Sequence, residues 1–147
     1  MRSLLLFIGL SLSLVLAGCG TAPERRLDSP AVQVNELSPS GETYTLSLRF
    51  VNPNTVPLVV SSSTHNLYLG ETRIASIKDR DPIGIPQLGG VNHTVKLSSA
   101  LAKTVRSYLA KHPDEDRASV ECSLEVSVSG DDTVTLKTSG GGSVKAR

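Results

Sequence analysis

The chain has 147 residues, with 15 Lys and Arg against 14 Asp and Glu, and its longest run of like charge is Asp114-Glu115-Asp116. This balance excludes the basic patch on which nucleic-acid binding depends, so no nucleic-acid partner is expected. The length suits a single domain with its own hydrophobic core. The sequence has two cysteines, too few for a disulfide framework, so we expect packing to supply the stability.

Residues 1–18 have the composition of a bacterial export signal. Arg2 provides a positive start, and residues 4–16 form an apolar run with three small interruptions. That run falls short of the ~20 apolar residues that a transmembrane helix needs. We therefore predict that residues 1–18 are a cleaved signal peptide.

The segment Leu16-Ala17-Gly18-Cys19 resembles the lipobox of bacterial lipoproteins, in which the cysteine receives a diacylglycerol before cleavage. The resemblance implies that Cys19 is the lipid attachment site and that its acyl chains anchor the protein to a membrane. Residues 19–30 contain two prolines and mixed charge, which predicts a lipidated tether. Gly20 stands where inner-membrane lipoproteins of enteric bacteria carry Asp, which favours the periplasmic face of the outer membrane.

Alternating apolar and polar residues dominate the chain from Ala31 onward, and this period of two is typical of strands with one buried face. In the longest such run, Cys122 and Leu124 share the apolar face, whereas Glu121 and Glu125 lie on the polar face. The last two strands are predicted to form a terminal hairpin. The predicted strands cover residues 31–37, 44–50, 57–60, 64–69, 72–78, 91–97, 118–129 and 133–138.

Residues 98–112 break the alternation, because Leu101, Val105 and Leu109 recur at helical spacing. Ser98 or Ser99 can cap this helix, and Pro113 prevents its continuation. Many short strands with one helix predict a mostly β fold, an antiparallel β-sandwich of the immunoglobulin or fibronectin III type. We assign this domain to residues 31–140 and predict that the glycine-rich end, residues 141–147, is a flexible tail.

Several segments go beyond the periodicity. In chain order they are Leu46-Ser47-Leu48-Arg49-Phe50-Val51-Asn52-Pro53-Asn54, Pro57-Leu58, Leu67-Tyr68-Leu69-Gly70, Ile74-Ala75, Ile83-Gly84-Ile85-Pro86 and Val95-Lys96-Leu97. With these segments the chain resembles the LEA type 2 family, also called the water-stress and hypersensitive-response (WHy) domain. The resemblance implies a folded β-sandwich with a helix and an association with desiccation, and it supplies no catalytic residues.

The turn motif Asn52-Pro53-Asn54 is predicted to have a structural role rather than to contact a ligand. Proline fixes φ and pushes Asn52 into the extended region, and the motif leaves Asn54 free for the left-handed region. The two side-chain amides can bond nearby backbone groups.

A search for reactive chemistry predicts no enzyme, no cofactor and no metal site. His65, His93 and His112 belong to separate predicted elements, and neither Cys nor carboxylate stands beside them at metal-ligand spacing. Asp79-Arg80-Asp81 and Asp131-Asp132 do not continue into a calcium-binding loop, so solvated turns are the better interpretation. Cys122 is interpreted as a small buried hydrophobe rather than as a reactive thiol.

These observations favour a monomeric, membrane-anchored, non-enzymatic protein associated with water stress. Two alternatives remain open from the sequence. The domain could bind a lipid or another apolar ligand beneath the helix, or it could be a structural accessory that docks a protein partner of an envelope complex by an edge strand.

Overall fold

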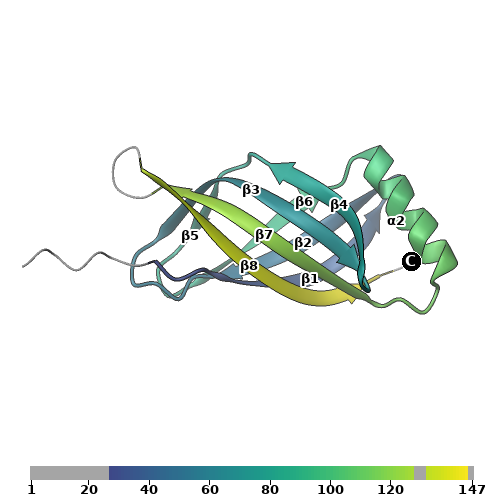
Figure 1. The fold of residues 1–147 in the computed structure, drawn as a ribbon, viewed down its shortest axis with the longest axis horizontal. Helices are drawn as coiled ribbons and strands as arrows, with labels where there is room; N and C mark the ends of the chain where they lie inside the picture. Colours follow the sequence, from purple (N-terminus) through teal and green to yellow (C-terminus); the bar gives the residue numbers. More distant parts are fainter. Residues whose placement is uncertain (1–26, 128–131, 146–147) are drawn as a thin grey trace, which may run out of the picture.

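The computed structural model describes residues 27–127 and 132–145, which form an elongated, curled β-sheet with a helix at one end (Figure 1). The predicted signal peptide and Cys19 lie outside the described residues. Among the described residues, no helix is both long and apolar enough to span a membrane. The elements are β1 (Ala31–Ser40), β2 (Thr43–Val51), β3 (Leu58–Leu69), β4 (Thr72–Asp79), β5 (Ile83–Ile85), β6 (Gly90–Lys96), α2 (Ser99–Lys111), β7 (Arg117–Ser127) and β8 (Thr133–Val144).

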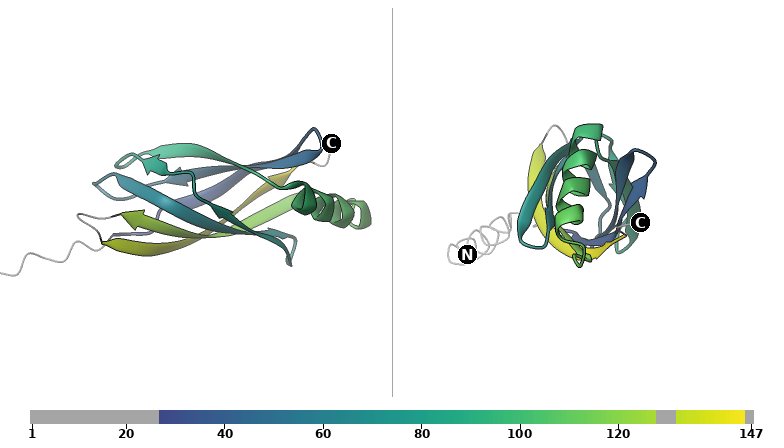
Figure 2. Two further views of the ribbon diagram at one scale, coloured as in Figure 1. Left: turned by 90° about the horizontal axis from the view of Figure 1, so that it is seen from above. Right: turned by 90° about the vertical axis from the view of Figure 1, so that its right-hand side faces the viewer.

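All these strands belong to one hydrogen-bonded sheet with the order β4-β3-β7-β8-β1-β2-β6, and β5 pairs with β3 beyond the end of β4. The β1–β8 pair is parallel, and the other pairs are antiparallel. The sheet curls so far that its first and last strands approach each other, as the end-on view of Figure 2 shows. The sheet is thus a half-barrel, and we call the line along which β4 and β6 approach each other its seam. A polar contact between Asp79 on β4 and His93 on β6 bridges this seam.

The prediction of a mostly β domain with one helix is confirmed. The immunoglobulin-like sandwich is not, because β8 joins β7 to β1 and thereby makes one sheet of what would otherwise be two. Two predicted strands, 57–60 and 64–69, are parts of the single strand β3, and the short strand β5 was not predicted.

The predicted flexible tail is wrong over its first four residues, because β8 continues to Val144. There Gly142 pairs with Val34 and Val144 pairs with Leu37. A Cβ atom on Gly142 would overlap the carbonyl oxygen of Val34, and one on Gly140 would overlap that of Val32. The glycines therefore permit a close approach of two strands rather than marking a loose end.

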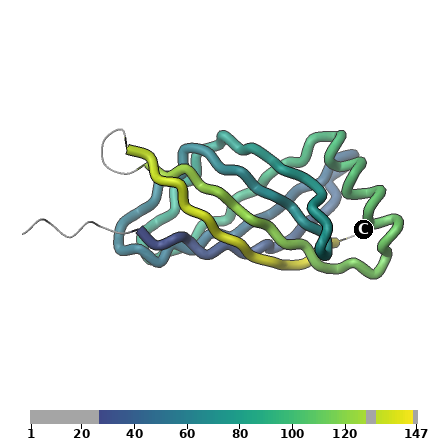
Figure 3. The backbone as a smooth tube through the Cα atoms, viewed as in Figure 1, coloured from purple at the N-terminus to yellow at the C-terminus, as the bar shows by residue number. Residues whose placement is uncertain are grey.

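The alternating pattern of the strands places their apolar side chains inside the curled sheet, as predicted for Leu124, which is fully buried, and for Glu125, which is exposed. Helix α2 covers one end of this core, with Ala102, Val105 and Leu109 buried and Ser98 accepting a hydrogen bond from the Leu101 N–H. The predicted helix is confirmed. The path of the backbone in Figure 3 shows that β1 begins at the end opposite to α2.

Candidate functional site

Asn52 ties the turn that follows β2 to the segment at the end of β5, at the end of the sheet where β1 begins. Its buried side-chain Nδ2 lies 2.8 Å from the carbonyl oxygen of Val56, 3.2 Å from that of Pro86 and 3.4 Å from that of Ile85. Its Oδ1 accepts hydrogen bonds from the backbone and side-chain N–H groups of Asn54, both at 2.9 Å. The amide thus satisfies carbonyls that a buried turn would otherwise leave unpaired.

Asn54 holds the segment that precedes the first strand. Its Oδ1 accepts from the Asp28 N–H at 2.9 Å, and its Nδ2 donates to the Asp28 carbonyl at 2.8 Å. Leu27 packs against the core beside this contact. Asn54 does not adopt the left-handed backbone conformation that the motif leaves open to it; among the described non-glycine residues, positive φ occurs at Leu88. Pro53, between the two asparagines, is exposed.

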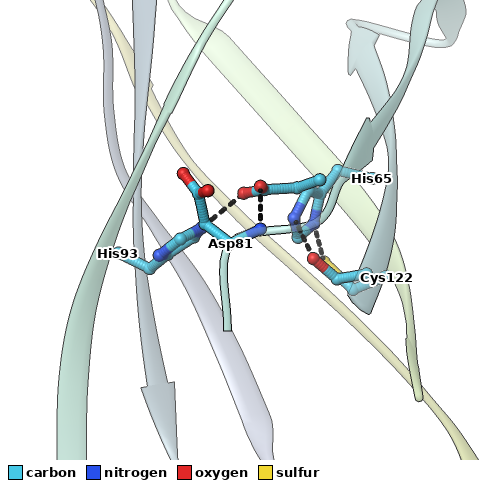
Figure 4. Close-up of polar contacts among 6 residues, drawn as sticks. His65, Asp81, His93 and Cys122 are labelled. Atoms are coloured by element: carbon cyan, nitrogen blue, oxygen red, sulfur yellow. Dashed lines mark hydrogen bonds and ion pairs between the residues drawn. The ribbon is translucent and has the colours of Figure 1, made fainter. Parts of the chain in front are cut away.

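A second polar cluster lies at the seam of the curled sheet and consists of His65 on β3, Asp79 at the end of β4 and His93 on β6 (Figure 4). Each of the three offers a potential ligand atom, and these atoms lie within 4.8 Å of one another. His93 Nε2 is 2.6 Å from Asp79 Oδ2, a contact that joins strands from the two ends of the strand order. The side chains of His93 and Asp79 are 14% and 12% exposed, so solvent reaches the cluster from outside.

His65 is fully buried, and both of its ring nitrogens have neighbours. Nε2 lies 2.9 Å from Ser63 Oγ, and Nδ1 lies 3.1 Å from Cys122 Sγ on the adjacent strand β7 (Figure 4). The Phe50 ring lies near both histidines in a tilted arrangement, with its centroid 6.4 Å from that of His65 and 6.5 Å from that of His93. Burial lowers the pKa of His65 from 6.5 to about 4, so the ring is neutral near pH 7.

Asp79 accepts two hydrogen bonds that favour its charged form. Burial acts to raise the pKa of this carboxyl group, but the backbone N–H of Asp81 and the imidazole of His93 outweigh burial and lower the pKa below its ordinary value. The Asp81 N–H donates to Asp79 Oδ1 at 2.9 Å, which leaves Oδ2 for His93. Asp79 is therefore a carboxylate at neutral pH.

The reason for predicting no metal site is thus wrong for two of the three histidines. His65 and His93 come from separate elements, yet the curl of the sheet brings them to one carboxylate. His112 lies elsewhere, exposed at the end of α2 and stacked on Tyr108 with ring centroids 4.4 Å apart. One sequence signal was available. His65, Asp79 and His93 each fall on the inward phase of their strand, where Leu67, Ile77 and Val95 also lie.

Cys122 is buried, as predicted, with 2% exposure. Burial raises the pKa of its thiol to about 12, which suppresses the reactive thiolate. We expect a thiol reagent such as a maleimide to label Cys122 only after the protein is unfolded in denaturant, as measured by mass spectrometry. Rapid labelling of the native protein would show that the interior of β7 opens to solvent.

The architecture defines a class of protein: a single curled, mostly antiparallel sheet with one end covered by a helix. The family model described as late embryogenesis abundant protein, type LEA_2, matches residues 47–146. The match spans more than half of the sequence, so the chain belongs to the LEA type 2 family, as its motifs predicted. A search of curated proteins finds no match to it.

Two solved structures share this fold. A protein of Arabidopsis thaliana, solved in solution, is 17% identical with a TM-score of 0.55, over 86% of this chain and 88% of its own. A solution structure assigned to a late embryogenesis abundant (LEA) protein is also 17% identical, with a TM-score of 0.51, over 92% of this chain and 78% of its own. At this identity the likeness establishes the fold alone.

Proposed function

We propose that this protein is a lipid-anchored, non-enzymatic LEA type 2 protein that acts during water stress at the periplasmic face of the outer membrane. The family match over residues 47–146 is the observation that carries the proposal. Residues 1–18 serve as the export signal, and Cys19 carries the acyl chains.

The start of the domain suits an anchor close by. Asn54 fixes Asp28 by two hydrogen bonds, and Leu27, eight residues after Cys19, packs on the core. Those eight residues would span at most about 28 Å if fully extended. The domain would therefore stay near the membrane to which Cys19 is attached.

The domain would be ready to act before drying begins, because its core is already buried. A folded domain does not have to meet the ordering entropy of coupled folding when water is withdrawn. Its strands turn polar side chains outward, among them Thr45 and Ser47 on β2 and Ser119 and Ser123 on β7. These hydroxyl groups would offer hydrogen bonds to neighbouring molecules as hydration falls.

The structure gives less support to an apolar-ligand carrier. The stripe of Ala102, Val105 and Leu109 on α2 is buried against the rest of the core. A surface hollow of about 620 Å³ near the start of β7 is lined partly by Glu71, Glu115 and Arg117. Charged groups of this kind do not suit an apolar ligand.

The test is survival of a deletion strain after drying and rehydration, compared with survival after osmotic shock alone. We expect the deletion to reduce survival after drying, the wild-type gene to restore it, and Cys19→Ala to restore it poorly because the protein lacks its lipid. Mass spectrometry of the wild-type N-terminal peptide should show acyl chains on Cys19. Unchanged survival of the deletion strain would refute the stress function, and an unmodified Cys19 thiol would refute the anchor.

A further inference from the structure

We propose that His65, Asp79 and His93 form a binding site for one divalent transition-metal ion, with Zn²⁺ as the reference ion. The three side chains come from β3, β4 and β6, and their potential ligand atoms lie within 4.8 Å of one another. The Asp79 carboxylate is hydrogen-bonded to His93 at 2.6 Å, and Figure 4 shows His93 and His65 in the same cluster. The inference is independent of the function in water stress.

The donor set selects the class of ion. Two imidazoles and one carboxylate form the ligand set of many zinc sites that keep a fourth position open for water. Imidazole suits Zn²⁺, Cu²⁺, Ni²⁺ and Fe²⁺, whereas Ca²⁺ and Mg²⁺ prefer sites made of oxygen ligands. The site should therefore discriminate against the alkaline-earth ions.

Neighbouring groups orient the ligands, as in established metal sites. Ser63 and Cys122 hold the His65 ring from both sides, and the Asp81 N–H holds Asp79 Oδ1. Binding would release one of the two contacts of His65, because a metal needs a free ring nitrogen. The Cys122 sulfur is not among the grouped ligand atoms, and we assign it to positioning His65 rather than to coordination.

The cluster can adjust to an ion without disturbing the core. Zinc bonds to nitrogen and oxygen are about 2.0–2.2 Å long, so the ligand atoms must draw closer to His65 than they are now. Asp79 is the last residue of β4, and His93 lies on the edge strand β6. Both side chains are partly exposed at the seam, which provides the entry path and the freedom to move.

The experiment uses the full-length protein in detergent, without a polyhistidine tag and freed of metal by a chelator. Titration calorimetry with ZnCl₂ should give one site per chain. Asp79→Asn and His93→Gln should each weaken zinc binding at least tenfold. Asp79→Asn retains the shape of the side chain and an oxygen for hydrogen bonding, so circular dichroism should show an unchanged fold.

His112→Gln is the matched control, because His112 is exposed and lies outside the cluster. Its zinc affinity should equal that of the wild type. The Co²⁺-loaded protein should show visible bands of nitrogen and oxygen coordination without a thiolate charge-transfer band. Zn²⁺ should raise the Tm of the wild type but not that of Asp79→Asn, and neither Ca²⁺ nor Mg²⁺ should bind.

The proposal is overturned if Zn²⁺ does not bind, or if Asp79→Asn and His93→Gln bind it as tightly as the wild type does. A loss of binding confined to His112→Gln would also overturn it, since that ion would be held at the surface. A thiolate charge-transfer band from Co²⁺ would replace the assigned ligand set with one that contains Cys122.

Discussion

Lowering the pH from about 7 to about 4 in the presence of a chelator is expected to reduce the free energy of unfolding by about 3 kcal/mol through His65 alone. In the folded protein the pKa of His65 is lowered by burial from 6.5 to about 4. Between these two values the unfolded chain binds a proton that the folded chain does not. Stability is therefore present above the unfolded pKa and is lost as the pH falls towards the folded pKa.

The other titratable groups around His65 also affect how stability depends on pH. Asp79 has a lowered pKa, so its contribution is lost at still lower pH, as the carboxyl group becomes protonated. The remaining titratable neighbours are His93, across the seam, and Cys122, whose raised pKa keeps it neutral throughout this range. The loss of stability between about pH 6.5 and pH 4 should therefore depend strongly on His65.

Urea unfolding at a series of pH values measures this effect. His65→Gln should flatten the dependence on pH between about 6.5 and 4, whatever it does to the stability at neutral pH. The control is His112→Gln, at an exposed histidine on the end of α2, which should retain the wild-type slope. A slope unchanged by His65→Gln would mean that His65 is not held neutral in the folded protein.

Gly142→Ala is expected to destabilise the protein by about 2–3 kcal/mol or more, because its methyl group has no space. The added carbon would overlap the carbonyl oxygen of Val34 on β1. A backbone atom cannot move aside as a flexible side chain can, so the pairing of β8 with β1 must open. That pairing is followed by a hydrogen bond from the Lys145 N–H to the Leu37 carbonyl and by an ion pair between Lys145 and Glu36.

Gly141→Ala is the matched control, one residue away on the opposite face of the strand. Gly141 is exposed, and a carbon added there would meet its nearest neighbour, the Ala118 carbonyl oxygen, at 3.5 Å. Its effect should be small, or stabilising by about 0.4–1 kcal/mol through the unfolded chain. Urea unfolding of both variants gives the comparison, and hydrogen exchange of residues 140–145 locates the loss. If the two variants are equally stable, the end of the chain is a tail and does not pair with β1.

The sequence predicts the local elements of this fold better than their assembly. The helix was found because Leu101, Val105 and Leu109 lie at helical spacing between a serine cap and Pro113. The inward face of β7 was found because Leu124 and Glu125 alternate in burial. Both signals depend on the order of residues within one element, which is the information that periodicity contains.

The link between β8 and β1 could not be predicted in the same way. A run of glycines is usual in flexible segments, and here it allows two backbones to approach closely. A flexible glycine run and a closely packed one differ in whether another strand lies against them, and here that strand is β1. Interpreting the glycine run as a tail removes the pairing of β8 with β1. That pairing is what joins the strands into one sheet instead of the two sheets of a sandwich.

The histidine cluster was missed for a related reason. His65, Asp79 and His93 are separated in sequence by more than ten residues each, and their proximity depends on how strongly the sheet curls. Curl depends on the twist and bulges of many strands, which a local pattern does not specify. The sequence does contain one signal, which is a polar residue on the inward face of each of three strands. Ligand spacing within a single segment does not reveal it, because the three residues belong to different strands.

The position of β1 decides how the domain would carry a mechanical load. Strand β1 is paired on both sides, with β2 and with β8, and the segment that precedes it is held by Asn54. A pull on the chain before Leu27 acts first on the two hydrogen bonds between Asn54 and Asp28, and then along β1 itself. Such a force loads the hydrogen bonds of β1 to β2 and to β8 at the same time, in shear. A pull on an edge strand would instead break the hydrogen bonds to a single neighbour one after another. A force applied before β1 is therefore received by an interior strand of the sheet, where two neighbouring strands share the resistance.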